Sequence, residues 1–469
     1  MPIRRMRAPR IDFSALRSEL DLPEAFPPQA QREAETTAAD PPDEGADRTG
    51  RPFVTIDPAG SRDLDQAMCL SRRDGGYRVE YAIADVASYV RPGGELEAET
   101  WRRGQTVYLP DGRVPLHPAV LSEDAASLLP DVDRAAVVWT IDLDRDGGIT
   151  AIELARSRVR SRARLDYRTV QASADAGTLP EPIALLPEIG TLLAARSSDR
   201  GAVNLPLPEQ EVERDGQGWR LVLRAPRPAE EHNAQISLLT GMAAATLMLR
   251  GRVGLLRTMP PPAPEAVAKL RAAAQSLGVA WPEGATVGAV VANADPGTPR
   301  GAAFLDQAAE LLRGAGYTAF DGSAPAQTGH GGVGAPYAHV TAPLRRLADR
   351  YVTEVCLALH EQRPVPEWAR TALPRLPEVM STTGRVAATA GRAAVDLTEA
   401  VLLEHRVGER FDAGVVDVDD ASKKRPGGTV AIDDPAVRAR CHGDLPLGER
   451  VEVTLTQADP TSRTVRFER

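Results

Sequence analysis

Three aspartates, Asp57, Asp63 and Asp65, lie within nine positions of one another. A β-favouring run ends at Ile56, and the segment 58–62 is rich in Pro, Gly and Ser, so a strand should end where a loop begins. Carboxylates this close repel one another, and a divalent cation is one way to compensate their charge. Mg²⁺ suits such a loop, because it binds one or two carboxylates and fills its other positions with water and phosphate oxygens. An ordinary Asp-rich turn would look the same, so these acids alone do not identify a metal site.

A second chemically suggestive segment carries two consecutive arginines, Arg345 and Arg346. Pro343 suits the first turn of a helix and Thr341 can cap it, so the sequence predicts a helix over Pro343–Leu359 that begins beside both arginines. Cations oppose the helix dipole at that end, a cost that a structure tolerates where an anion such as phosphate binds. Two exposed arginines with no ligand would give the same pattern.

The elements that must position these segments divide the sequence into three parts. Residues 1–50 have little periodicity and a linker-like composition, and we expect a mostly flexible arm with room for a short helix over Phe13–Leu20. Strand-like alternation follows in residues 52–143, and three-to-four spacing of apolar residues then indicates helices. The predicted helices are Gln235–Arg250, Pro264–Leu277, Ala302–Gly314, Pro343–Leu359 and Val379–His405. The last 65 residues return to short strands, with the rhythm of a five-stranded oligonucleotide-binding barrel.

Arginines occupy every second position of one stretch: Arg156, Arg158, Arg160, Arg162 and Arg164. A strand would place all five side chains on one face, whereas a helix would spread them around its axis. We therefore predict a strand here. The arginine face is either the solvated side of an edge strand or a surface that meets phosphates.

Composition excludes several classes of protein. Only three of the 56 basic residues are lysine, and no GxxxxGK[ST] phosphate loop is present. Cys69, Cys356 and Cys441 lack metal-ligand spacing, so neither a paired-cysteine zinc site nor a disulfide framework is expected. No apolar run approaches the roughly 18 residues that a membrane span needs, and no secretory segment is visible. We therefore expect a cytoplasmic protein without membrane association, and a monomer.

Both chemically suggestive segments, in this order, resemble the catalytic (RNB) domain of the ribonuclease II family. That family places an isoleucine–aspartate strand end before an aspartate-x-aspartate-aspartate loop, which Ile56–Gln66 resembles except at its last position. Much later it has a tyrosine-x-histidine-x-threonine-serine-proline-isoleucine-arginine-arginine run, similar to Tyr337–Arg346. Further similar segments lie at 84–90, 103–110, 121–128 and 200–202, and the likeness covers about residues 51–400. Only about fifty residues precede it, which is typical of a bacterial type without N-terminal cold-shock domains.

The resemblance implies an α+β fold in three parts. After the arm of residues 1–50, residues 51–404 would form the RNB-like catalytic domain, with mixed sheets and covering helices around an RNA channel. Residues 405–469 would form a small OB-like, S1-type β-barrel that binds RNA. The implied activity is that of a metal-dependent 3′–5′ exoribonuclease. It would hydrolyse single-stranded RNA to nucleoside 5′-monophosphates with Mg²⁺, or alternatively Mn²⁺, as cofactor.

The resemblance also implies a role for particular residues. Asp57, Asp63 and Asp65 would coordinate the metal ion, and Asp65 and Arg345 would be the catalytic residues, with Arg345 on the scissile phosphate. The implied RNA-binding residues are Tyr108, Tyr167, Leu205 and Arg346.

Two departures from the family pattern leave alternatives open. Gln66 stands where the family has its fourth aspartate, and Asn204–Leu205 stand where it often has an aromatic residue. Gln66 keeps an oxygen that can accept a hydrogen bond from metal-bound water, so we expect an active enzyme with a high Mg²⁺ requirement. A catalytically impaired RNA-binding relative and a single-strand DNA nuclease are the alternatives, since only contacts to the 2′-hydroxyl separate RNA from DNA.

Overall fold

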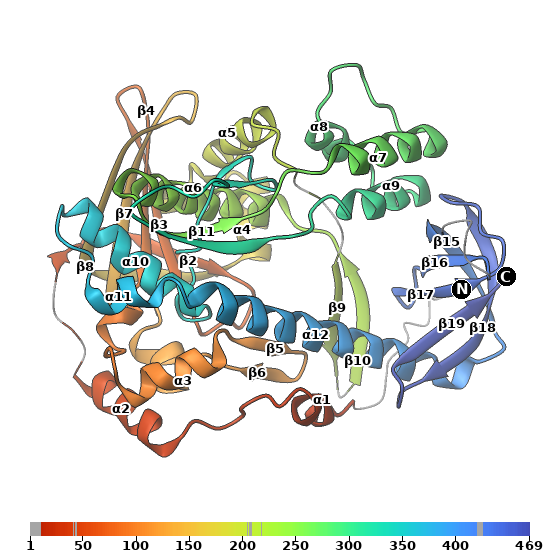
Figure 1. Cartoon of the computed structure of the whole chain (residues 1–469), viewed down its shortest axis with the longest axis horizontal. Helices are drawn as coiled ribbons and strands as arrows, with labels where there is room; N and C mark the ends of the chain where they lie inside the picture. The colour runs from red at the N-terminus through yellow and green to blue at the C-terminus, as the bar shows by residue number, and fades with distance from the viewer. Residues whose placement is uncertain are drawn as a thin grey trace.

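A curved six-stranded sheet forms the centre of the structure, which is a computed structural model (Figure 1). The structure describes residues 11–40, 42, 45–203, 205, 209–216, 218–419 and 425–469. Its strands are β1 (Ala46–Asp47), β2 (Phe53–Asp57), β3 (Gln66–Arg73), β4 (Gly76–Ala84), β7 (Asp133–Asp144) and β8 (Ile149–Asp166), in the order β1-β8-β2-β3-β4-β7. β8 is 18 residues long, so it pairs with β7 through its first part and with β2 through its last part. The sheet thereby closes on itself, and the end of β2 lies beside the start of the antiparallel β3.

Helices cover both faces of this sheet, because alternate strand residues point to opposite sides. Met68 and Leu70 of β3 face a core that also contains residues of α5 (Leu186–Asp199), α6 (Pro228–Gly251) and α10 (Leu347–His360). Ala67 and Cys69 face a second core with α2 (Pro28–Ala39) and α3 (Glu95–Arg103). The sheet is therefore sandwiched, which confirms the predicted α+β class. No helix in the described ranges combines the length and the apolar character that crossing a bilayer demands.

Further strands and helices complete the part of the chain before residue 376. The strands are β5 (Val107–Leu109), β6 (Gly112–Val114), β9 (Glu209–Asp215), β10 (Gly218–Arg224), β11 (Val253–Thr258), β12 (Gly316–Asp321), β13 (Gly329–His330) and β14 (Ala335–Pro336). The helices are α4 (Tyr167–Asp175), α7 (Pro264–Leu277), α8 (Val287–Ala292), α9 (Pro299–Ala309) and α11 (Glu367–Ala372). The helices α7, α8 and α9 enclose a hydrophobic cluster of their own.

The arginine-rich stretch is part of β8, as its alternation predicted. Ser157, Val159 and Ser161 are buried, while the arginines between them stay partly or fully exposed. Protein groups engage every one of these guanidiniums: Arg156 meets Asp85 and Glu354, Arg158 meets Asp47, Arg160 meets Asp133, Arg162 donates to Thr49 O and Arg164 donates to Ser61 O. The arginine face therefore helps to fasten the segment around β1 onto the sheet.

The N-terminal segment differs from the expected flexible arm. Residues 14–19 form α1 (Ser14–Glu19), close to the short helix that the sequence allowed, and α2 follows. Phe13 is fully buried against the ring of Trp219 at 5.6 Å, and the small side chains of Ala30 and Ala34 are fully buried as well. The apolar residues of this segment are few or small, so their spacing in the sequence did not predict a folded segment. They nevertheless pack closely against the surface that the rest of the protein provides. Residues 1–10 of the expected arm lie outside the described ranges.

One long helix joins the body of the structure to the C-terminal barrel. α12 (Leu376–Leu403) has 28 residues, and the hairpin of β9 and β10 packs along it (Figure 1). The barrel consists of β15 (Arg410–Val418), β16 (Gly427–Ile432), β17 (Val437–His442), β18 (Arg450–Asp459) and β19 (Thr464–Glu468). It is closed in the order β15-β16-β17-β19-β18, which confirms the predicted five-stranded barrel.

A single buried carboxylate ties together α12, the β9–β10 hairpin and the barrel. Glu399 of α12 is 4% exposed and accepts hydrogen bonds from Nε2 of Gln210, at 2.8 Å, and from the backbone N–H of Arg438, at 2.9 Å. Burial raises the pKa of Glu399 from 4.5 to about 7, although both hydrogen bonds oppose this change. The junction is therefore sensitive to pH.

Replacing Phe13 by alanine should destabilise the protein by about 3–5 kcal/mol, the usual cost of deleting a buried aromatic side chain. The measurement is the unfolding midpoint in urea, with Ser14→Ala as a control, because Ser14 is exposed on the same segment. An unchanged midpoint for Phe13→Ala would mean that the N-terminal segment is not part of the folded core.

Glu399 should make stability fall as pH rises. In the unfolded chain Glu399 ionises near pH 4.5, whereas in the folded protein it keeps its proton up to about pH 7, so folding takes up a proton between these values. The Tm of Glu399→Gln relative to wild type should therefore be higher at pH 8 than at pH 5, corresponding to at most about 3 kcal/mol. Glu378→Gln, on an exposed position of the same helix, should show no such trend. A Tm difference between Glu399→Gln and wild type that stays constant from pH 5 to pH 8 would contradict the raised pKa of Glu399.

Candidate active site

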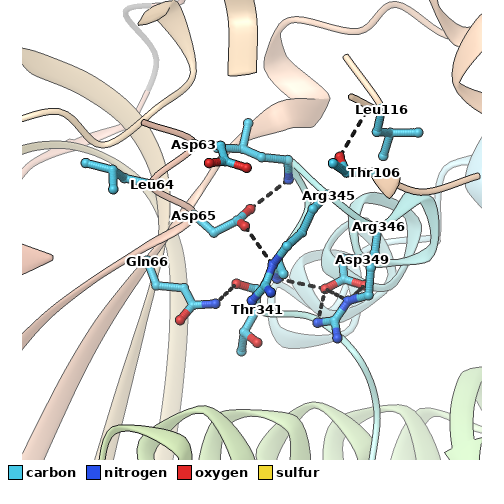
Figure 2. A network of polar contacts seen from close by, with 12 residues as sticks. Asp63, Leu64, Asp65, Gln66, Thr106, Leu116, Thr341, Arg345, Arg346 and Asp349 are labelled. Atoms are coloured by element: carbon cyan, nitrogen blue, oxygen red, sulfur yellow. Dashed lines mark hydrogen bonds and ion pairs between the residues drawn. The ribbon is translucent and has the colours of Figure 1, made fainter. Parts of the chain in front are cut away.

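The three predicted acids lie where β2 ends and β3 begins. Asp65 is 3% exposed, and its Oδ1 accepts a hydrogen bond from the backbone N–H of Leu344 at 2.7 Å. Its Oδ2 accepts from Nε of Arg345 at 3.2 Å (Figure 2). Asp63 accepts from the hydroxyl of Tyr108 at 2.9 Å. Oδ2 of Asp57 is buried and has no hydrogen-bond partner among the described residues. The acid loop and the arginine segment, about 280 positions apart, thus meet at one site.

Burial makes negative charge costly at this site. It raises the pKa of Asp57 and of Asp65 from 3.8 to about 7 in each case. The charge of Arg345 opposes both changes, and the charge of Asp63 adds to both. The acids therefore lack full compensation by the protein's own cations.

The arginine segment is a loop rather than the first turn of a helix. α10 begins at Leu347, not at Pro343 as predicted, because side chains and strands capture the backbone before it. Asp65 binds the N–H of Leu344, Oδ2 of Asp349 binds the N–H of Ala342 at 2.8 Å, and the N–H of Thr106 donates to the carbonyl of Arg345 at 3.0 Å. One helix-like bond forms, from the N–H of Arg346 to the carbonyl of Ala342 at 2.9 Å, but the N–H of Leu347 donates to the carbonyl of Gly104 at 2.9 Å instead of continuing that pattern.

The two neighbouring arginines have different surroundings. The side chain of Arg345 is 46% exposed, and only its Nε is bound to Asp65 in the described structure. Arg346 binds Asp349 through both Nε and Nη2, and the side chain of Asp349 is fully buried. Arg345 therefore offers its terminal nitrogens to a ligand, whereas Arg346 neutralises an internal carboxylate. The expected contact of Arg346 with RNA stays a prediction.

Two tyrosines of the predicted RNA-binding set lie near the acids. The side chain of Tyr108 on β5 is 49% exposed, although its hydroxyl is bound to Asp63. Tyr167 begins α4 and accepts from Nδ2 of Asn233 at 3.1 Å; burial, and then the charge of Asp57, raises its pKa to about 12. The contact between Tyr108 and Asp63 thus gives a site in which a half-exposed aromatic ring lies beside the carboxylates.

Leu205 was predicted to bind RNA, but it does not lie beside the acids. Arg113 was not predicted, and it does lie there. Leu205 packs against the cluster of α7, α8 and α9, where an aliphatic side chain contributes to a core. Arg113 of β6 lies directly opposite Tyr108 in the β5–β6 hairpin and also binds Asp63. The sequence signal that could have identified Arg113 is the Pro110-Asp111-Gly112 turn, because it implies a hairpin that pairs positions 108 and 113.

The acids suit a hard divalent cation by their chemistry, but they do not form a preformed cage. In the described part of the chain, no group of three or more His, Cys, Asp or Glu residues is arranged to hold a metal ion. The oxygens of Asp63 and Asp65 are bound by protein donors. The unpartnered oxygen of Asp57 and the raised pKa values are the features that a cation would relieve. The residues therefore fit a metal ion that binds together with phosphate oxygens and water.

The fold and the site together define a protein of the RNB class with a C-terminal oligonucleotide-binding barrel. The family model for the RNB domain matches residues 46–361, and the model for the RNase II-type exonuclease C-terminal S1 domain matches residues 409–469. The chain belongs to the RNB-domain family.

Its curated relatives include exonucleases from bacteria and eukaryotes. The chain is 27% identical to Ribonuclease R of Vibrio cholerae over 85% of this chain and 52% of that protein. It is 29% identical to Ribonuclease R of Escherichia coli over 71% and 43%, and 28% identical to Exosome complex exonuclease RRP44 homolog A of Arabidopsis thaliana over 73% and 38%. The chain thus spans about half the length of these relatives, or less.

Solved structures share the fold at lower identity. Mycoplasma genitalium RNase R in complex with ribose methylated single-stranded RNA has a TM-score of 0.85 and 19% identity, over 97% of this chain and 77% of that chain. Yeast Ssd1, a pseudonuclease, has a TM-score of 0.69 and 18% identity, over 89% and 52%. These likenesses establish the fold, and the fold alone does not decide catalysis, because nucleases and a pseudonuclease share it.

Arg345→Lys should lower RNA cleavage far more than Arg346→Lys. A point-charge lysine cannot reproduce the guanidinium fork at developing phosphate charge, and losing one preorganised donor costs about two to three orders of magnitude in turnover. Arg346→Lys should instead lower the Tm, because Arg346 supports the buried Asp349. Single-turnover cleavage rates and thermal unfolding of both variants provide the check; equal losses of turnover would refute the distinction.

Proposed function

We propose that this chain is a metal-dependent 3′–5′ exoribonuclease that hydrolyses single-stranded RNA to nucleoside 5′-monophosphates. The observation that carries this proposal is the meeting of Arg345, half exposed, with the buried Asp65 beside two further acids. The names of the relatives, ribonucleases R and an exosome exonuclease, support the reaction class. The directionality and the products follow from the family resemblance.

The terminal nucleotide would be held by an aromatic ring and by a cation. The hydroxyl of Tyr108 is fixed on Asp63, so its exposed ring has a defined orientation on which a base can stack. Such stacking tolerates any base, as a processive nuclease requires. No described residue is hydrogen-bonded to the terminal nitrogens of Arg345, and these can bind the oxygens of a phosphate.

Catalysis would depend on preorganised charge. Asp57, Asp63 and Asp65 would hold Mg²⁺, or Mn²⁺, which when bound supplies Lewis acidity and lowers the pKa of a coordinated water. Arg345 stabilises negative charge that develops on the phosphate in the transition state. Asp65 orients Arg345 through its Nε. The hydrogen bond from the N–H of Leu344 to Asp65 holds the arginine loop beside this carboxylate. In this proposal Arg345 and the metal ion held by the acids would both contact the same phosphodiester.

A catalytically impaired RNA-binding protein is the second candidate function. Gln66 replaces one family acid, and the same fold occurs in a pseudonuclease. Both functions involve single-stranded RNA, so binding alone does not separate them.

The three cysteines are free and buried, which fits a reducing compartment, and we propose that the protein acts in the cytoplasm.

Single-stranded RNA labelled at its 3′ end should release a labelled mononucleotide at once, whereas RNA labelled at its 5′ end should shorten stepwise. Cleavage should need Mg²⁺ in the millimolar range, and Mn²⁺ should support it at a lower concentration. Asp65→Asn should abolish cleavage and leave RNA affinity nearly unchanged. The measurement is gel and chromatographic analysis over a metal titration, with DNA of the same sequence in parallel. A wild-type protein that binds RNA but stays inert at every metal concentration would support the second candidate.

A further inference from the structure

Gln66 has contacts that give it a role other than that of a replaced metal ligand. It is the first residue of β3, and its Nε2 donates to the backbone carbonyl of Thr341 at 2.6 Å (Figure 2). Its Oε1 accepts from the hydroxyl of Tyr81, also at 2.6 Å. We propose that Gln66 is a positioning residue, which sets the place of Arg345 by fastening the start of the arginine loop. Its effect on turnover rests on the proposed function.

The two partners fix the orientation of the carboxamide. The carbonyl of Thr341 can only accept, so the amide nitrogen of Gln66 must face it and the oxygen must face Tyr81. Tyr81 is fully buried, and burial raises the pKa of its phenol well above the usual value, so the hydroxyl keeps its proton and donates. The oxygen of Gln66 is therefore engaged by Tyr81, contrary to the expectation that it accepts from a metal-bound water.

Two consecutive residues fasten two points of the same loop. Asp65 holds the N–H of Leu344, and Gln66 holds the carbonyl of Thr341, three positions earlier. Arg345 follows directly after Leu344, the point that Asp65 holds. The hydroxyl of Thr341 is bound in turn to Ser237 of α6 at 2.8 Å, so the start of the loop also touches the helix below the sheet. Losing the contact at Thr341 would remove one hydrogen bond that holds the backbone before Arg345, while the bonds of Ala342 to Asp349 and of Thr106 to Arg345 would remain.

A neutral amide suits this position better than a carboxylate. An ionised carboxylate has no donor, so Glu at position 66 would turn an acceptor toward the carbonyl of Thr341, and the shorter Asp would offer no donor to it either. It would also add charge at a site where burial already raises the pKa of Asp57 and Asp65. Glutamine thus provides the contact without adding to the repulsion.

The test is Gln66→Met, which keeps the length of the side chain and removes both hydrogen bonds without adding charge. Three properties are measured on the full chain: amide hydrogen exchange of peptides covering residues 337–347, single-turnover cleavage, and direct binding of Mn²⁺ by electron paramagnetic resonance. Gln210→Met is the matched control for exchange, because it removes a glutamine-to-carbonyl bond, to Ala436 at 2.7 Å, in the distant barrel junction. Tyr81→Phe is a second, milder variant in case Gln66→Met folds poorly.

We expect faster exchange of the loop peptides in Gln66→Met, a smaller change in Tyr81→Phe and none in Gln210→Met. Turnover of Gln66→Met should fall by about ten- to a hundredfold, the scale of a misplaced catalytic group, with KM and Mn²⁺ affinity within about threefold of wild type. In the background of Arg345→Lys the loss should be smaller, because Gln66 acts through Arg345.

Unchanged exchange in the loop peptides would overturn the inference, and so would a loss of Mn²⁺ affinity that parallels the loss of turnover. A wild-type protein that never cleaves RNA, but whose loop loosens in Gln66→Met, would sink the proposed function and leave the contact of Gln66 standing. An inert wild type with an unaffected loop would sink both.

Discussion

The buried carboxylate of Asp65 is the point on which the site depends. An isolated carboxylate in a low-dielectric interior is costly, and it is tolerated when hydrogen bonds and a cation compensate it. Asp65 obtains one backbone donor from Leu344 and one guanidinium from Arg345, both from a segment far away in the sequence. The compensation is incomplete, because the pKa of Asp65 still lies near 7. The interaction that assembles the site therefore also leaves it short of positive charge, as a site that receives a cation requires.

The rest of the fold keeps this contact in place. The long β8 closes the sheet next to the point where β2 ends and β3 begins, and two helical layers bury the two faces of the sheet. The β5–β6 hairpin brings Tyr108 and Arg113 to Asp63 from another side. At its turn, Asp111 is bound through both carboxylate oxygens by Arg17 of α1. The N-terminal segment thus contacts the β5–β6 hairpin, which binds Asp63, through one ion pair, and this gives the segment a structural role that its composition did not suggest.

Much of this arrangement could be predicted from the sequence, and the failures have physical causes. Periodicity revealed the strands, the long helices and the barrel, because amphipathic patterns report burial directly. The predicted start of α10 was wrong. Pro343 and Thr341 are good local signals for a helix start, but the preceding backbone is held by two long-range contacts, from Asp65 and Thr106, and by a local one from Asp349. The folded segment at 11–40 was missed because its buried residues are few or small. Arg113 was missed because its importance comes from pairing with Tyr108, which a motif does not display.

The two adjacent arginines show how far a motif can determine function. The two residues are of the same type, and the family resemblance implies that Arg345 meets the scissile phosphate and that Arg346 also binds RNA. In the structure, Arg346 is engaged at two nitrogens by a fully buried carboxylate, whereas Arg345 keeps its terminal nitrogens exposed beside the acids. An arginine that neutralises a buried acid can leave it only at the cost of an uncompensated charge, so it is poorly suited to release and rebind a moving RNA chain. The same reasoning separates Gln66 from the acids next to it: what each side chain touches limits what it can do, whatever residue the family pattern places there.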